Sequence, residues 1–370
     1  MPNITKQQED TYRLVLLNAD IAAQTNQGER ALKLLGSLEV MDLSPSLQAG
    51  YFAIAGEACY WLGQYEKARI NLETALQLYR HPEGDVATPL RIAQLRNFLA
   101  GSYYGQNQHQ KALDLHLLCL QGVLDGYITE PRYILKLYNN LGIENFLLGH
   151  LTTALQYYQE ALKVAEEVDD ECDRGAIFWG MGLTYRLLED YNQAHKALQK
   201  GLKHYKKAGA WERMPGIKNT LGWVLISMGE YDQAEKILKS GLGEAIKKTK
   251  NIHDQALLNS NLGFLYQKRG SGEVAENYIL TGLALAHQTG NKQTLGLVQA
   301  QLADVRLARG SAIEEVCPLF EDALASLRQT DSFEFTRRVY KLYADALKKA
   351  GLFKEAFDVL NQTFANLKRI

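Results

Sequence analysis

The sequence lacks the features of a membrane or secreted protein. No run reaches the roughly 18 consecutive apolar residues that a membrane helix needs, and the first ten residues, MPNITKQQED, have no apolar core of the signal-peptide kind. The four cysteines, Cys59, Cys119, Cys172 and Cys317, are far apart and form no CxxC pair. These absences predict a cytoplasmic protein with free thiols and no membrane partner.

An excess of charge of one sign is also missing. The chain has 41 Lys and Arg against 42 Asp and Glu, a net charge of −1, which gives no electrostatic reason to expect nucleic-acid binding. It has only 7 prolines and no Pro/Ser/Gly-rich linker, so we expect one continuous domain over residues 1–370. HExxH, GxGxxG, GxxxxGK[ST] and GxSxG are all absent, and the histidines show no metal-ligand spacing. The sequence therefore predicts a non-enzyme without metal or cofactor.

What is present is a repeat. Strings such as "YNNLG" (138–142) and "KNTLG" (218–222) precede a Gly- or Asn-containing turn, a small residue and a second apolar run. The small residues serve as anchors of nine units: Ala31, Ala68, Ala112, Ala154, Ala194, Ala234, Ala275, Val316 and Ala356. Consecutive anchors are 37, 44, 42, 40, 40, 41, 41 and 40 residues apart. A near-constant period over the whole chain is typical of a solenoid.

Each unit contains two apolar runs of helical length and spacing, joined by a short turn. Small residues recur twelve positions before the anchor, as at Gly56, Gly182, Gly222 and Gly263, where they allow two helices to approach closely. One helix pair cannot bury its apolar face alone, so neighbouring pairs must stack. The prediction is an all-α solenoid, a right-handed superhelix of about nine antiparallel helix pairs.

The clearest copy, "YNNLGIENFLLGHLTTALQYYQEAL" (138–162), resembles the tetratricopeptide repeat (TPR) family. The period near 40 is longer than the usual 34 of that family, and long-period forms are similar to those of kinesin light chains and bacterial peptide-sensing regulators. Two irregularities stand out. Residues 80–90 should form an exposed loop, and Pro318 should delay or kink the second helix of its unit.

The resemblance implies that the first helix of each unit lines a concave groove that binds a peptide or partner. Residues 15, 11 and 8 positions before the anchor should then face the groove. The candidate binding residues at these offsets are Asn97, Tyr104, Asn139, Phe146, Trp179, Arg186, Asn219, Trp223, Phe264 and Gln267. Toward the end of the chain the inward-facing positions are charged: Asp304, Lys341, Asp345 and Lys348.

The asparagines divide into two groups. Asn97, Asn139 and Asn219 should face the groove, where an amide can both donate to and accept from a peptide backbone, although a framework role is the alternative. Asn140 and Asn261 fall one residue later and should join neighbouring helices.

Charged residues offer a second kind of contact. Arg186, the lone cation of the central positions, suits a carboxylate or phosphate, with a salt bridge to a neighbour such as Glu189 as the alternative. The charged runs "EEVDDECD" (166–173) and "HYKKAG" (204–209) should be solvated helix ends.

Three functions remain open on the sequence. The first is a non-enzymatic module, regulatory or scaffolding, that binds a peptide or a partner protein and leaves a homo-oligomer open. The second is a small-molecule sensor, for example for an oligosaccharide stacked on Trp179 and Trp223. The third and least favoured is an enzyme, since the central positions offer only Arg186.

Overall fold

The computed structural model describes residues 5–40, 43–79, 87–328 and 333–367, and these residues form helices joined by short turns. The chain divides into two compact units, residues 1–144 and residues 145–370, which are considered separately below. The boundary falls inside the helix α7.

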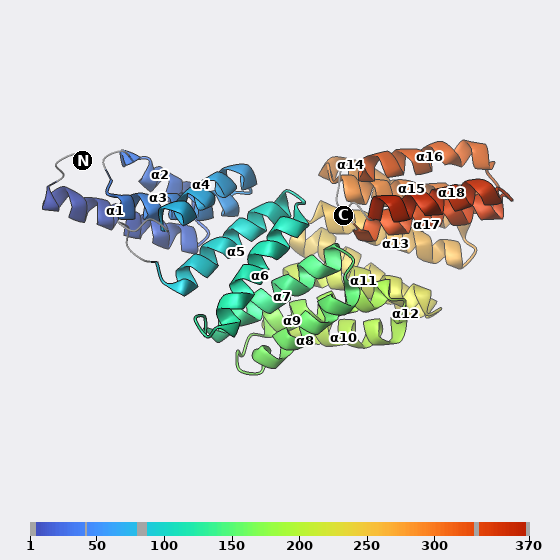
Figure 1. Cartoon of the computed structure of the whole chain (residues 1–370). Coiled ribbons are helices and arrows are strands. Elements are labelled where there is room, and N and C mark those ends of the chain that lie inside the picture. Colours follow the sequence, from blue (N-terminus) through green and yellow to red (C-terminus); the bar gives the residue numbers. More distant parts are fainter. Residues whose placement is uncertain (1–4, 41–42, 80–86, 329–332, 368–370) are drawn as a thin grey trace. The chain divides into compact units, whose positions relative to one another are not determined.

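Unit 1 contains the first helices of the chain, coloured blue to green in Figure 1. They are α1 (Lys6–Gln24), α2 (Gly28–Leu35), α3 (Pro45–Trp61), α4 (Tyr65–Leu78), α5 (Pro89–Gly105), α6 (His109–Leu124) and most of α7 (Pro131–Leu147). The expected loop at 80–90 lies largely outside the described residues, but Thr88 caps α5 by accepting a hydrogen bond from the Arg91 amide at 3.2 Å.

Unit 2 contains the remaining helices (Figure 1). They are α8 (Leu151–Ala165), α9 (Glu171–Leu187), α10 (Tyr191–Ala208), α11 (Met214–Ser227), α12 (Tyr231–Glu244), α13 (Ile252–Lys268), α14 (Gly272–Thr289), α15 (Lys292–Ala308), α16 (Ile313–Leu327), α17 (Phe333–Lys349) and α18 (Phe353–Leu367). Two short elements, the 3-10 helix η2 (Trp211–Arg213) and the π-helix η3 (Ala245–Thr249), lie between pairs. The odd-numbered helices α11, α13, α15 and α17 contact one another in sequence, as do the two helices of each pair. For the part of the chain that the structure describes, the predicted all-α repeat of nine helix pairs is confirmed.

The anchors are among the most buried positions of the repeat. All nine, from Ala31 to Ala356, are 1% exposed or less. Facing them, the glycines twelve positions earlier lie directly on a branched side chain of the partner helix. A Cβ added to Gly222 would sit 2.4 Å from the Leu238 side chain, and one added to Gly263 would sit 2.3 Å from Ile279. No side chain fits in that space, which explains why these positions are glycine.

The turn inside each pair uses one left-handed residue. Nine such residues lie five or six positions before an anchor: Asn26, Gly63, Asn107, Gly149, Glu189, Gly229, Gly270, Gly310 and Gly351. Glycine and asparagine adopt this conformation at low cost. Glu189, with φ of 61°, is the exception among them.

The expectation of a delayed helix at Pro318 is wrong. Helix α16 begins at Ile313, three residues before Val316, and this is the same offset that α4, α12 and α14 show. Pro318 lies inside α16. Gly310 lies six residues before Val316, whereas the other left-handed turn residues lie five before their anchors. The turn of this helix pair therefore contains one extra residue, and the helix itself keeps the register of the repeat.

Candidate functional site

A cavity of about 900 Å³ lies within unit 2. Its walls come mainly from the first helices of five consecutive pairs, α9, α11, α13, α15 and α17, as the offsets before the anchor predict. The main lining residues are Arg186, Glu189, Trp223, Ile226, Phe264, Lys268, Gln301, Asp304, Glu334, Arg337, Arg338, Lys341, Asp345, Lys348 and Lys349. Seven of these are cationic and four acidic, and Trp223, Ile226 and Phe264 supply apolar surface.

Trp223 is the centre of the charged part of the cavity. The guanidinium carbon of Arg186 lies over its ring at 5.0 Å from the ring centroid, and that of Arg338 at 5.4 Å. Both distances are within the range of a cation–π interaction. Arg186 is only 6% exposed, and its charge is balanced by an ion pair with Glu334.

Arg338 has no such balance. Its Nη2 donates a long hydrogen bond of 3.5 Å to the Asn261 amide oxygen, and it forms no ion pair with any residue that the structure describes. Burial, together with the nearby positive charge of Arg186, lowers the pKa of Arg338 to about 9, and Glu334 only partly opposes this. A guanidinium without a counter-charge is costly in such a place.

The other acids of the cavity are already paired with lysines. Glu189 pairs with Lys341 at 3.0 Å, Asp304 with Lys349 at 3.5 Å and Asp345 with Lys348 at 3.9 Å. Arg338 and Lys268 are the lining cations that form no ion pair with any described residue, so the cationic surplus falls mainly on these two. Arg338 lies over Trp223, and Lys268 lies over Phe264.

Three buried polar atoms on the cavity wall have no hydrogen-bond partner among the described residues, and all three are N–H donors. They are Arg186 Nε, Trp223 Nε1 and Gln301 Nε2. Gln301 is 3% exposed, and its amide is oriented by the Ser260 hydroxyl, which donates to Oε1 and leaves Nε2 without a partner. Buried donors without partners cost free energy unless a ligand or water accepts from them.

Contacts between α9 and α17 close one side of the cavity. Arg186 pairs with Glu334, Arg337 Nη1 donates to the Leu187 carbonyl oxygen at 2.7 Å, and Lys341 pairs with Glu189. We refer to these three as the α9–α17 contact. Glu189 takes part although its backbone is left-handed, a conformation that costs a glutamate roughly 1 kcal/mol. Strain of this kind is often retained where the side chain has a task.

A row of side-chain hydrogen bonds links the first helices of consecutive pairs. Asn140 donates to Asn97 at 2.8 Å in unit 1, and Asn261 donates to Asn219 at 2.8 Å in unit 2. The linking role expected of Asn140 and Asn261 is thus present. The acceptors, Asn97 and Asn219, are two of the three asparagines that we expected to face a ligand, so their carbonyl oxygens already have a partner within the protein.

Trp179 takes part in the same row. Its indole N–H donates to the Thr220 hydroxyl at 3.1 Å, and its ring lies against Gly216, where an added Cβ would be 2.6 Å away. Trp179 is thus held between α9 and α11.

The remaining predicted residues are scattered. Tyr104 is 45% exposed on unit 1, and Asn139 has a buried Oδ1 without a hydrogen-bond partner among the described residues. Phe146 is only 7% exposed, so it belongs to the packed interior. Gln267 donates to Asp304 at 2.9 Å and thereby supports the cavity wall. Of the ten predicted residues, the cavity is lined by Arg186, Trp223 and Phe264.

The residues that sequence reasoning missed are Gln301, Glu334, Arg337 and Arg338. Gln301 stands 15 positions before Val316, so the repeat offset already marked it. Arg337 and Arg338 lie one turn, and Glu334 two turns, before Lys341, the first expected inward-facing position of α17, and no offset identifies them.

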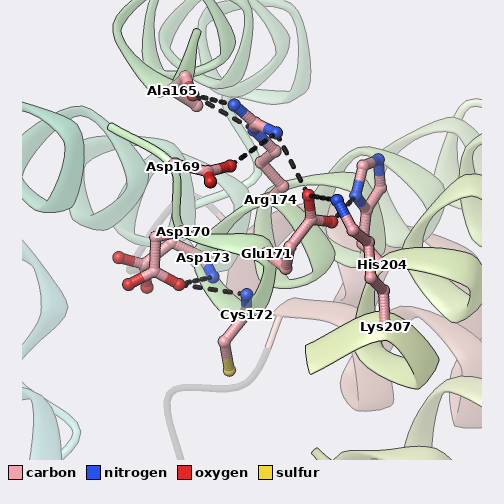
Figure 2. Close-up of polar contacts among 9 residues, drawn as sticks. All are labelled: Ala165, Asp169, Asp170, Glu171, Cys172, Asp173, Arg174, His204 and Lys207. Atoms are coloured by element: carbon pink, nitrogen blue, oxygen red, sulfur yellow. Dashed lines mark hydrogen bonds and ion pairs between the residues drawn. The ribbon is translucent and has the colours of Figure 1, made fainter. Parts of the chain in front are cut away.

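The two charged runs pair with each other (Figure 2). Glu171 accepts from Lys207 at 2.7 Å, and its other oxygen lies 2.6 Å from His204 Nδ1. These bonds lower the pKa of Glu171 to about 2. Arg174 donates to the Ala165 carbonyl oxygen at 2.6 Å, and Asp170 caps the start of α9. Both runs therefore have a structural role and fasten α9 to its neighbours, although the Glu171 side chain is only 14% exposed and is not solvated as expected of these helix ends.

Among the residues that the structure describes, no three His, Cys, Asp or Glu side chains lie close enough together to hold a metal ion. None of the helices found there combines the length and the apolar character needed to span a bilayer.

Comparison with known proteins supports the fold. The tetratricopeptide repeat family model matches residues 133–207. A Rap protein complexed with Competence and Sporulation Factor has a TM-score of 0.71 at 12% identity, covering 97% of this chain and 98% of that one. The apo form of the quorum sensor NprR from B. thuringiensis has a TM-score of 0.72 at 17% identity, covering 88% and 89%. The Rap conjugation gene regulator of plasmid pLS20, in complex with the Phr* peptide, has a TM-score of 0.63 at 13% identity, covering 97% and 93%.

One curated relative is also similar over part of the chain. The type II methyltransferase M.CeqI of Rhodococcus hoagii is 24% identical over 204 residues, which are 55% of this chain and 38% of that protein. The chain thus spans well under half the length of that relative. Taken with the helix pairs, the matches show a TPR-like repeat protein with the fold of the Rap and NprR solenoids.

Proposed function

We propose that the chain is a non-enzymatic regulatory or scaffolding module of the cytoplasm that binds a peptide, or a peptide-like segment of a partner protein, in the cavity of unit 2. The observation that carries the proposal is the cavity wall. It combines apolar surface at Trp223, Ile226 and Phe264 with buried N–H donors that have no partner. Such walls suit a ligand with both side chains and carbonyl oxygens.

The fold supports the same proposal. A solved protein of this fold is described in complex with the Phr* peptide, and stacked helix pairs present extended inner surfaces that suit an elongated ligand. The cavity of about 900 Å³ has the volume for several residues of a peptide.

The sugar-sensor alternative has less support. Stacking on a saccharide needs an open indole face, but Trp223 carries two guanidinium groups and Trp179 is held between helices. An enzymatic role has less still, because the acids of the cavity are each paired with a cation.

The proposal is tested by capture of peptides from a degenerate heptapeptide library on the immobilised full chain, read by mass spectrometry. Peptides retained by the wild type should be lost with Phe264→Ala, which removes apolar surface from the cavity. The matched control is Phe353→Ala, because Phe353 is 70% exposed on α18 and lies outside the cavity lining. Retention of no peptide, or equal retention by Phe264→Ala, would contradict the proposal.

A further inference from the structure

The cavity wall has an excess of hydrogen-bond donors over acceptors among its unpartnered polar groups. The three buried atoms without partners all donate and none accepts, and the one unpaired guanidinium beside them, Arg338, also only donates. A ligand that satisfies this wall must bring acceptors and negative charge.

The net charge of the side chains near Trp223 indicates how much negative charge the ligand should bring. Two guanidinium groups, those of Arg186 and Arg338, lie over the ring, and one carboxylate, Glu334, is paired with Arg186. The local sum is one positive charge. A single carboxylate neutralises it, whereas a phosphate group carries about −1.5 to −2 and would exceed it.

We infer that this corner of the cavity is a carboxylate subsite, in which Arg338 pairs with an acidic group of the peptide ligand while nearby N–H groups such as Trp223 Nε1 donate hydrogen bonds to its remaining acceptor positions. The inference rests on the proposed function, and it adds that the ligand is acidic at the position that reaches Trp223, through an Asp or Glu side chain or a free C-terminus.

The arrangement favours a guanidinium over an ammonium at position 338. A planar guanidinium can lie on the Trp223 ring and still present two parallel N–H groups to a carboxylate. Arg186 is less suited as the partner because Glu334 already occupies it.

The test uses the full chain and small probes that do not depend on knowing the ligand. N-acetylglycine carries one carboxylate, and its N-methylamide is the neutral counterpart. The chain has four tryptophans, so their indole N–H signals are few in an NMR spectrum, and Trp223→Phe assigns the one of interest. Titration with N-acetylglycine should shift the Trp223 signal, and the methylamide should not.

Variants separate the subsite from general charge attraction. Arg338→Met should weaken N-acetylglycine binding by about tenfold. Arg338→Lys keeps the charge, so its affinity for N-acetylglycine should lie between those of Arg338→Met and the wild type. Lys163→Met removes one positive charge from unit 2 outside the cavity, where Lys163 is 70% exposed and pairs with Glu160, and it should leave the titration unchanged. An equal effect of Lys163→Met and Arg338→Met would refute a defined subsite.

Two further outcomes decide against the inference. Absence of a Trp223 shift with N-acetylglycine would refute it, and tighter binding of inorganic phosphate at Trp223 would reassign the subsite to a phosphoryl group.

Failure of the inference is distinguishable from failure of the proposed function. Captured peptides whose retention survives Asp→Asn, Glu→Gln and C-terminal amidation keep the function and overturn the subsite. A Trp223 shift with no captured peptide overturns the function and the peptide part of this inference.

Discussion

At the scale of single residues, Glu171 shows how one carboxylate fastens two helices. It begins α9 and pairs with His204 and Lys207 of α10. These partners lower its pKa to about 2, from 4.5 in an unfolded chain. A carboxyl group with a lowered folded-state pKa stabilises the fold above its unfolded pKa, and that contribution is lost as pH falls through the folded value.

We therefore expect Glu171→Gln to lower the free energy of unfolding at pH 7, with a difference from the wild type that shrinks as pH falls from about 4.5 toward 2. Urea unfolding followed by circular dichroism at a series of pH values measures this. The control is Glu160→Gln, since Glu160 pairs with Lys163, which is 70% exposed, and such pairs contribute little. A difference independent of pH would contradict the assignment.

For Arg338, the proposed role in ligand binding conflicts with its effect on the stability of the fold. Burial without a counter-charge lowers its pKa to about 9. Because this basic group has a lower pKa in the folded than in the unfolded chain, its charge opposes folding at neutral pH, and the cost is relieved only as pH rises above about 9.

Arg338→Met should therefore stabilise the ligand-free protein at pH 7, by on the order of 1 kcal/mol. Arg186→Met should do the reverse, because it leaves Glu334 without its cation. Thermal melts of both variants decide the point. A lower melting temperature for Arg338→Met would mean that its contacts with Trp223 and Asn261 outweigh the burial of its charge.

At the scale of helices, packing within each pair depends on the glycine that faces the second helix. A Cβ at Gly222 would lie 2.4 Å from Leu238, which is fully buried and has no room to move. Gly222→Ala should therefore destabilise the protein by about 1 to 3 kcal/mol.

The neighbouring helix supplies the control for that substitution. Gly243 is in α12 and has no atom within 4 Å of an added Cβ. Gly243→Ala should stabilise α12 by up to about 1 kcal/mol, because alanine is the better helix former. Chemical denaturation of the two variants measures the change in the free energy of unfolding, which should be a decrease for Gly222→Ala and an increase for Gly243→Ala. Equal effects would show that close packing is not the reason for glycine at position 222.

The elements could be predicted from the sequence because the repeat is local. The period, the buried anchors and the small residues twelve positions earlier fix each helix pair, and the same offsets place Arg186, Trp223 and Phe264 on one cavity. The asparagines show the limit. Periodicity places Asn97 and Asn219 on the inner helices but does not reveal that Asn140 and Asn261 bond to them.

Arg337 and Arg338 lay beyond the prediction for a different reason. Their position depends on how far the helices of unit 2 turn between α9 and α17, and small rotations between successive pairs add up to that turn. A periodic pattern in the sequence contains no measure of these rotations. Glu189 offered a hint, since it is a glutamate at a turn position where most other helix pairs have glycine.

At the scale of the whole molecule, the α9–α17 contact departs from a simple repeat array. In such an array each pair contacts its neighbours, but Lys341 meets Glu189 from 152 residues away. Both side chains are half exposed, so the pair contributes at most about 1 kcal/mol to global stability. Its effect should be local, on whether α17 stays against α9 beside the cavity.

We expect Glu189→Lys to loosen α17, because the new lysine faces Lys341 and Arg337. Lys341→Glu should do the same by placing two acids together, and the double exchange should restore the contact. Hydrogen–deuterium exchange of peptides from α17 measures this, with faster exchange in each single variant and wild-type exchange in the double. Peptides from α14, which takes no part in the contact, serve as the internal control. Since α9 and α17 both line the cavity, looser single variants should also release a bound peptide faster, and unchanged α17 exchange in both would show that the pair does not hold the two helices together.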